Sequence, residues 1–192
     1  MGQQSTFIFI TGGVRSGKTS FAERLAMEYA EKDNLQLHYL ATGVVTDDEM
    51  KERVERHQKI RAVQKRQWKT WEQPSDLQEL LSSFHKQDVL LVDCLTTLVS
   101  NELFQGEQQE WNEQMLKELQ GKIEAAVLSL SKSCSIFLIV SNEVTYEALQ
   151  TPLLITYSRL LGRLHQTFVH IADEAYLVDS GIPIRKKEGR QV

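Results

Sequence analysis

Cysteine is scarce in this chain, which has only Cys94 and Cys134 among its 192 residues. Each lies beside an apolar run, and neither has a second cysteine or a histidine at the spacing of a metal site. The pattern therefore indicates neither a disulfide scaffold nor a zinc module. We expect two buried thiols in a reducing compartment.

An excess of basic residues and long apolar runs are also missing. The chain has 22 lysines and arginines against 26 aspartates and glutamates, a net charge of −4. Binding a phosphate backbone needs a dominant basic surface, so we expect no nucleic-acid partner. No apolar run is long enough to cross a bilayer, and the first residues lack the pattern of a signal peptide. We expect a cytoplasmic protein without a membrane span.

Three prolines and ten glycines are scattered along the chain, with no repeat and no stretch of linker composition. With 41% hydrophobic and 25% charged residues, the composition is that of an ordinary globular protein. We therefore expect a single domain over residues 1–192, with Arg185–Val192 as a frayed, basic tail.

Short apolar runs bounded by polar turns predict strands that are buried on both faces. They cover Phe7–Ile10, Leu35–Ala41, Val89–Val92, Ile136–Val140 and Ala175–Val178. Apolar residues recur at helical spacing between these runs, over Phe21–Ala30 and Trp111–Leu130. This alternation predicts an α/β fold of the P-loop NTPase-like kind, with a mostly parallel sheet and helices on both faces.

A glycine-rich segment follows the first predicted strand and opens a helix. Its residues are Gly12, Gly13, Val14, Arg15, Ser16, Gly17, Lys18 and Thr19. This spacing predicts a loop whose backbone N–H groups and helix dipole converge on phosphate oxygens. We expect Lys18, from a solvent-facing cradle, to reach the β- and γ-phosphates, and the Thr19 hydroxyl to coordinate Mg²⁺. The alternative is a glycine-rich turn without a ligand.

A carboxylate, Asp93, stands directly after the apolar run Val89–Val92. In P-loop enzymes the second acidic group, which holds or orients Mg²⁺, usually lies at such a position. The alternative is an acidic residue that ends a strand for solubility alone.

His57 lies in the charged, helix-favouring segment 47–67, with Arg53 and Arg61 four residues away on either side. Two cations disfavour the imidazolium, so they keep the imidazole neutral and nucleophilic, and their forked donors suit phosphates. This environment suits a histidine that attacks phosphorus. The alternative is a solvated surface histidine.

Trp68 and Trp71, which come next, are interpreted as packing residues more readily than as a platform for a nucleobase. The other histidines have no mutual spacing of a metal site, and we interpret them as structural. They are His38, His85, His165 and His170.

Taken together, these motifs resemble the bifunctional adenosylcobinamide kinase / adenosylcobinamide-phosphate guanylyltransferases, and the resemblance covers nearly the whole chain. An ordered set of segments carries it. They are Thr11–Thr19, Ala41–Thr42, Asp47–Met50 with Arg53, His57 and Arg61, Trp68–Pro74, Asp93–Leu98 with Asn101, Ser141–Val144, and Ala172–Glu174.

The resemblance implies that His57 attacks the α-phosphate of GTP, which gives a guanylylated enzyme and pyrophosphate. The GMP group then passes to adenosylcobinamide phosphate, and the same chain phosphorylates adenosylcobinamide with ATP or GTP. It also implies a homotrimer. The implied nucleotide contacts outside the glycine-rich loop are Ala41, Thr42, Gly43, Gln58, Lys59, Ile60, Arg61, Glu72 and Asp93.

The chain departs from the family pattern in its last third. Thr145 stands where the family typically reads glycine after Asn-Glu-Val, Ser158-Arg159 where it carries an Arg-Asp pair, and His165 where asparagine is usual. The resemblance implies that these positions concern the corrinoid pocket and the kinase step more than guanylyl transfer.

Two other functions fit the same motifs. One is a P-loop small-molecule kinase that forms no covalent intermediate and in which His57 is structural. The other is a non-catalytic protein that uses bound nucleotide to switch a surface. A covalent nucleotide adduct would distinguish the bifunctional enzyme from the simple kinase. Turnover would distinguish either enzyme from the non-catalytic protein.

Overall fold

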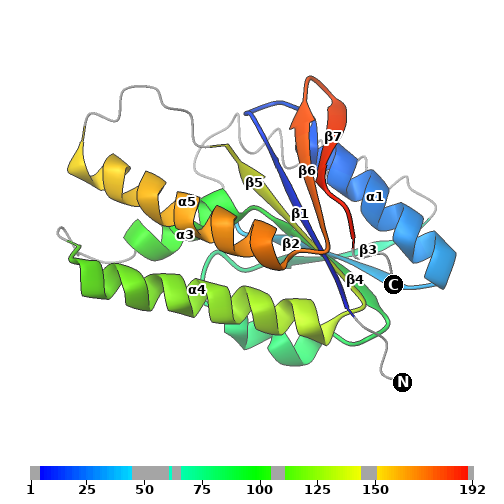
Figure 1. Ribbon diagram of the computed structural model, residues 1–192. Helices are drawn as coiled ribbons and strands as arrows, with labels where there is room; N and C mark the ends of the chain where they lie inside the picture. The colour runs from blue at the N-terminus through cyan, green and yellow to red at the C-terminus, as the bar shows by residue number, and fades with distance from the viewer. Residues whose placement is uncertain (1–4, 45–60, 62–65, 105–110, 144–150, 190–192) are drawn as a thin grey trace.

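A computed structural model describes residues 5–44, 61, 66–104, 111–143 and 151–189. These residues form one seven-stranded sheet flanked by helices (Figure 1). None of the described helices has the length and apolar character needed to cross a membrane.

The strands are β1 (Thr6–Gly12), β2 (Gln36–Ala41), β3 (Trp68–Glu72), β4 (Asp88–Asp93), β5 (Ile136–Asn142), β6 (Glu174–Asp179) and β7 (Ile182–Lys187). The helices are α1 (Lys18–Asp33), the 3-10 helix η1 (Leu77–Ser83), α3 (Leu95–Phe104), α4 (Glu113–Ser133) and α5 (Pro152–Ile171). The strand order is β3-β2-β4-β5-β1-β6-β7, and every pair is parallel except β6–β7. The predicted α/β fold and its five predicted strands are confirmed.

The strands at the two edges of the sheet, β3 and β7, were not predicted. The prediction of a frayed tail from Arg185 is wrong for its first three residues, because Arg185–Lys187 complete β7. A two-residue turn, Ser180–Gly181, joins β6 to β7, and both residues have positive φ, 51° and 82°. Such turns match the twist of a hairpin. Charged residues on an edge strand also discourage pairing with other chains, which is why β7 resembles a tail in composition.

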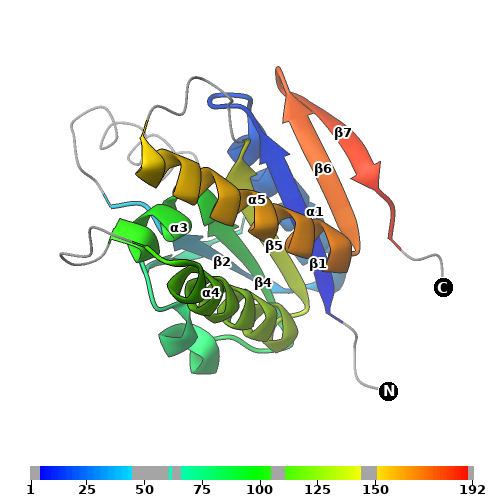
Figure 2. The same ribbon diagram turned by 60° about the vertical axis from the view of Figure 1, so that its left-hand side comes forward.

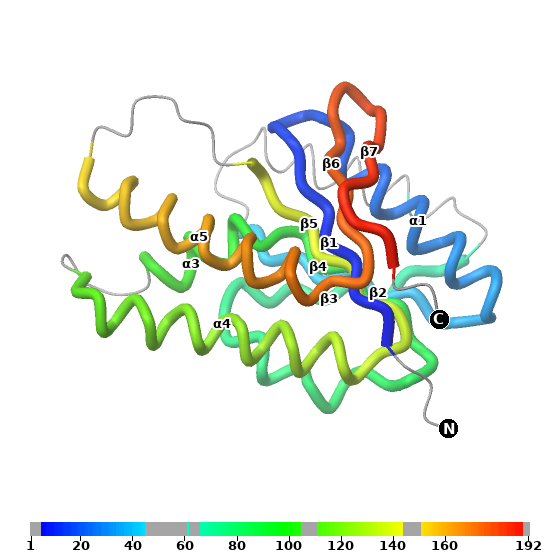
Figure 3. Tube along the Cα trace, in the orientation of Figure 1, coloured from blue at the N-terminus to red at the C-terminus, as the bar shows by residue number. Residues whose placement is uncertain are grey.

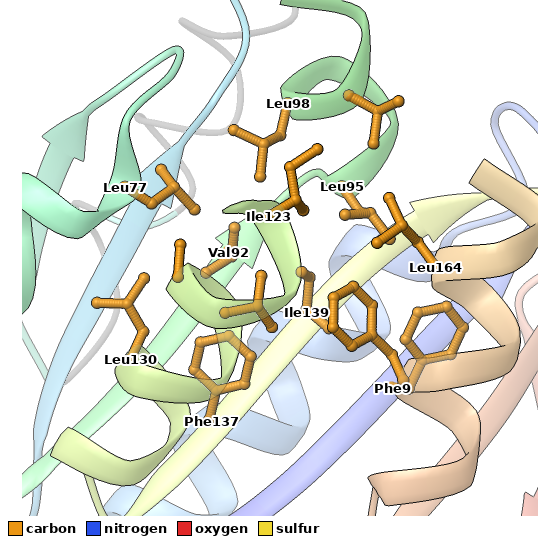
Figure 4. Packing of buried hydrophobic residues seen from close by; sticks show 14 of the residues in the cluster. Phe9, Leu77, Val92, Leu95, Leu98, Ile123, Leu130, Phe137, Ile139 and Leu164 are labelled. Carbon is orange, nitrogen blue, oxygen red and sulfur yellow. The ribbon is translucent and has the colours of Figure 1, made fainter. Parts of the chain in front are cut away.

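Helices cover both faces of the sheet. Helices α3, α4 and α5 lie on one face, and α1 lies on the other (Figures 1 and 2). Side chains alternate accordingly along β1: Phe7 and Phe9 face the layer of α3, α4 and α5, whereas Ile8 and Ile10 face α1. Figure 4 shows Phe9 with Phe137 and Ile139 of β5 in the layer beneath α4 and α5.

The cysteines differ in their surroundings. Both are free thiols; Cys134 is buried as expected, whereas Cys94 is only half-buried. Cys94 follows β4 directly and belongs to a turn at the carboxyl edge of the sheet, which explains its partial exposure.

The first strand of the chain lies among the last ones. Strand β1 pairs with β5 on one side and with β6 on the other, as the tube in Figure 3 shows. Because β5 separates β1 from β4, the segments that follow β1 and β4 are two strands apart. All parallel strands end at one edge, so the residues after them gather there.

Gly12 ends β1 where a side chain has no room. A Cβ atom built there would meet the backbone oxygen of Val178 on β6, and would lie 2.6 Å from Ser16 Oγ. We predict that Gly12→Ala lowers the free energy of unfolding by about 1–3 kcal/mol, because the backbone oxygen cannot rotate away. Denaturant unfolding measures this change.

The matched control is Gly121→Ala in α4, where a Cβ meets nothing within 4 Å among the described residues. Alanine in a helix interior stabilises by about 1 kcal/mol relative to glycine, so this variant should be more stable than the wild type. A Gly12→Ala protein as stable as the wild type would contradict the close contact between β1 and β6.

Candidate nucleotide-binding site

The loop between β1 and α1 has the backbone of a phosphate cradle. Arg15 and Gly17 have positive φ, 60° and 88°, and the Ser16 amide donates to Gly13 O at 3.1 Å. The helix begins at Lys18, with Gly17 as its N-cap. The first amides of a helix have no intrahelical acceptor, and its dipole favours an anion there. The loop can therefore bind phosphate oxygens.

Lys18 crosses the inside of this loop, where its Nζ donates to Gly13 O at 2.9 Å. The residue is only 8% exposed, so the lysine itself is buried within the cradle that was expected to face solvent. A hydroxyl of the loop itself, Ser16 Oγ, is buried and has no hydrogen-bond partner within the described residues. Buried hydroxyls are normally paired, and a phosphate would supply the acceptors. The loop therefore fits an anionic ligand.

The turn between β6 and β7 supports the loop from the side. The Gly181 amide donates to Ser16 O at 2.8 Å, and a Cβ on Gly17 would lie 3.3 Å from Gly181 Cα. A cavity of about 390 Å³ opens beside the loop; Val14, Arg15, Glu143 and Asp179 are among the residues that line it. This volume is within the usual range for a small-molecule site.

Asp93 is the last residue of β4, and its carboxylate is half-buried at the same edge of the sheet. Tyr39 of β2 donates its hydroxyl to Asp93 Oδ2 at 2.7 Å. Burial, and then the charge of Asp93, raise the pKa of Tyr39 well above its usual value, so the phenol stays protonated and donates. Because β5 lies between β1 and β4, the two strand ends are about 10 Å apart.

A magnesium ion could be held at this edge by the Thr19 hydroxyl and the Asp93 carboxylate. Among the described residues no three His, Cys, Asp or Glu side chains gather as a preformed metal site. Magnesium bound with a nucleotide usually takes one or two carboxylates, waters and phosphate oxygens, so such a sparse donor set fits it. The site suits Mg²⁺ brought with a nucleotide.

Arg61, expected to face phosphates, lies instead in the interior. Its Nη1 pairs with Glu23 Oε1 of α1 at 2.8 Å, and the two residues are 5% and 3% exposed. Its guanidinium carbon also stands 3.7 Å from the centre of the Tyr39 ring. The arginine therefore joins α1 to β2 beneath the edge, and its charge is already compensated.

Of the other predicted contacts, Ala41 ends β2 and pairs with both Asp93 and Glu72. Glu72 is exposed at the end of β3, and Gly43 is half-buried. Thr42 is fully buried: its hydroxyl donates to Cys94 O and accepts from Cys94 N, both at 2.8 Å. Its side chain therefore fixes the turn after β4.

His57, Gln58, Lys59 and Ile60 lie outside the described residues. Beside them in sequence, the tryptophans pack as the packing interpretation predicted. Trp71 donates Nε1–H to His38 Nδ1 at 3.0 Å, and the Trp68 ring meets Tyr39 edge-on at 6.3 Å.

Several residues of this region were missed by the sequence analysis. Tyr39 and Glu23 sit in apolar or helical patterns that do not distinguish them from ordinary core or surface residues. Asn142 and Glu143 were noted only within a family motif, yet Asn142 pairs with Gly12 and the Glu143 amide donates to Gly12 O. The signal that could have found them is their place directly after a buried strand.

A phosphate cradle after the first strand, and an acidic residue two strands away at the same edge, define a P-loop nucleotide-binding protein. The fold agrees with that of a solved structure, which is described as an ATPase domain. The TM-score is 0.52 at 12% identity, over 95% of this chain and 77% of that one.

The family model "Cobinamide kinase / cobinamide phosphate guanyltransferase" matches residues 8–186, and the chain belongs to this family. The bifunctional adenosylcobalamin biosynthesis protein CobU of Escherichia coli is 32% identical over 94% of this chain and 99% of its own length. CobP of Pseudomonas aeruginosa is 33% identical over 93% of this chain and 95% of its own.

We predict that Lys18→Ala weakens GTP binding at least tenfold, because the ammonium meets phosphates in a loop screened from water. The control is Lys32→Ala, an exposed lysine in the last turn of the same helix, which should bind GTP as the wild type does. Calorimetric titration measures both, with thermal melts to verify folding. Unchanged GTP affinity in folded Lys18→Ala protein would rule out the loop as the triphosphate site.

His165, one of the departures from the family pattern, is a half-buried base. Its Nε2 is 2.7 Å from Ser141 Oγ, and its ring meets Phe9 edge-on at 5.2 Å. Desolvation lowers its pKa to about 4. The unfolded chain, with a pKa near 6.5, binds this proton first as the pH falls. Stability from His165 is therefore present above pH 6.5 and lost between pH 6.5 and 4.

We predict that acidification from pH 7.5 to 5.5 costs the wild type about 1 kcal/mol more unfolding free energy than it costs His165→Asn. The control His170→Asn changes an exposed histidine of the same helix and should follow the wild type. Urea unfolding at the two pH values gives the comparison. Equal losses in all three proteins would mean that folding does not lower the pKa of His165.

Proposed function

We propose that this chain is a bifunctional enzyme that phosphorylates adenosylcobinamide with ATP or GTP and transfers GMP from GTP to adenosylcobinamide phosphate. The observation that supports this most strongly is the cradle itself. Lys18 stands where phosphates would bind, with the buried hydroxyl of Ser16, which has no partner in the part of the chain that the structure describes. The family match over residues 8–186 supports the choice of substrates.

Guanylyl transfer takes two displacements at phosphorus. In the first, an imidazole nitrogen of His57 attacks the α-phosphate of GTP, and the bond from that phosphorus to the β-phosphate oxygen breaks, which releases pyrophosphate. In the second, a phosphate oxygen of adenosylcobinamide phosphate attacks the same phosphorus. The phosphorus–nitrogen bond then breaks, and free histidine returns.

The cradle favours this chemistry by holding the departing phosphates. Lys18 and the first amides of α1 stabilise negative charge that grows on the leaving pyrophosphate. Mg²⁺, when bound by Thr19 and Asp93, would neutralise charge on the phosphate oxygens. The loop also orients GTP, so the attack by His57 becomes a step within one enzyme–GTP complex and no longer depends on a chance encounter.

The kinase step can use the same loop with a different phosphate. The hydroxyl of adenosylcobinamide attacks the γ-phosphate, the nucleoside diphosphate leaves, and no enzyme nucleophile is required. Whether ATP or GTP is used, the triphosphate binds to the same backbone amides of the loop and to the same lysine, Lys18. The homotrimer that the resemblance implies and the cytoplasmic location remain predictions.

We predict that His57→Ala abolishes the covalent GMP adduct while GTP binding persists, because the imidazole forms the intermediate and the loop holds the triphosphate. Mass spectrometry after exposure to GTP and Mg²⁺ detects the adduct. His85→Ala removes an exposed histidine that precedes β4 and is the control; it should form the adduct as the wild type does.

An adduct on the His57→Ala protein, or none on the wild type, would contradict the proposed mechanism. In that case phosphorylation of a small molecule without a covalent intermediate becomes the better account. Residual phosphorylation of adenosylcobinamide by His57→Ala is expected, since that step takes the γ-phosphate.

A further inference from the structure

Four polar side chains form a continuous row beneath the candidate site, from α1 to the end of β4. Glu23 pairs with Arg61 at 2.8 Å, Arg61 lies over the ring of Tyr39 at 3.7 Å, and Tyr39 donates to Asp93 at 2.7 Å. The first three are buried, with exposures of 3%, 5% and 8%. We call this row the Glu23–Asp93 network.

Each member of the network depends on the next. A buried carboxylate or guanidinium is costly unless paired, so Glu23 and Arg61 hold each other in place. The guanidinium on one face of the Tyr39 ring is a cation–π contact, and the Trp68 ring meets Tyr39 edge-on. The phenol ring is therefore fixed, and so is the direction in which its hydroxyl points.

The network runs from a residue one helical turn beyond Thr19 to Asp93, and Thr19 and Asp93 are the two residues that could hold a metal ion. Glu23 lies four residues after Thr19 on α1, so the two occupy one side of the helix, one turn apart. At the other end, the Tyr39 hydroxyl bonds to Oδ2 of Asp93 and so fixes the rotation of the carboxylate. Its other oxygen, Oδ1, then has a defined direction, as metal ligands require.

We propose that Tyr39 is a positioning residue that orients the Asp93 carboxylate toward the metal of a bound nucleotide, with Glu23 and Arg61 holding its ring. This rests on the proposed function, because Asp93 acts on a metal only if the loop binds a nucleotide. Tyr39 touches neither substrate nor metal in this role. Its effect is on the affinity and geometry of the metal site.

The test measures metal binding directly. The protein is saturated with the α,β-methylene analogue of GTP, which cannot release pyrophosphate, and Mn²⁺ is titrated by its paramagnetic resonance signal. Tyr39→Phe keeps the ring and its contacts with Arg61 and Trp68 and loses only the hydroxyl. We expect it to bind Mn²⁺ about tenfold more weakly, with less than about twofold change in metal-free nucleotide affinity.

The matched control is Tyr176→Phe. Tyr176 donates its hydroxyl to Glu174 Oε2 at 2.6 Å, so this variant also removes a tyrosine–carboxylate hydrogen bond, but outside the network. It should bind Mn²⁺ as the wild type does. A second variant, Arg61→Lys, keeps a cation beside Glu23 and loses the planar contact with Tyr39, and it should weaken Mn²⁺ binding in the same direction.

Asp93→Asn, measured in parallel, distinguishes an error in the positioning role of Tyr39 from an error in the metal site itself. If it weakens Mn²⁺ binding and Tyr39→Phe does not, the positioning role is wrong and the metal site stands. If Asp93→Asn leaves Mn²⁺ binding unchanged, Asp93 holds no metal, and the proposed role of Tyr39 is then wrong as well. Loss of metal-free nucleotide binding in Tyr39→Phe equal to its loss of Mn²⁺ binding would indicate a general structural effect and overturn the proposal.

Discussion

The register of the parallel strands decides which side chains can act together in this protein. Gly12 pairs with Asn142, Asp93 with Val140 and Ala41, and Ala41 with Glu72. The strands belong to segments far apart in sequence, and only their hydrogen bonds bring the ends to one edge. A shift by one residue would turn side chains such as those of Asp93 and Glu72 to the other face of the sheet.

The glycine-rich loop is held in shape before any ligand binds. Its close contact with β6 at Gly12, the hydrogen bond from Gly181, and the lysine that crosses its interior all fix the backbone. A loop that is already ordered loses little entropy when it takes up a phosphate, so more of the contact energy is available for binding. The Glu23–Asp93 network extends the same rigidity to the acidic end of the site.

Much of this arrangement could be predicted from local patterns. The five apolar runs reveal the buried strands because central strands of a parallel sheet are apolar on both faces, and the glycine spacing reveals the loop. The edge strands β3 and β7 were not predicted, because half-exposed strands carry polar and charged residues and so form no apolar run. The buried position of Arg61 was not predicted for another reason. It depends on an ion pair with Glu23, which is 38 positions away in the sequence. Tyr39 resembles its apolar neighbours, and only the fold shows that its hydroxyl meets Asp93.

A crystal structure with the α,β-methylene analogue of GTP and Mg²⁺ tests the central claim most directly, since it locates the triphosphate and the metal at once. The account predicts phosphate oxygens on the amides of residues 13–19 and on Lys18 Nζ, and a metal between the Thr19 hydroxyl and Asp93. A triphosphate bound elsewhere, for example in the cavity of about 160 Å³ between α4 and α5 that Arg159 and Arg163 line, would contradict it.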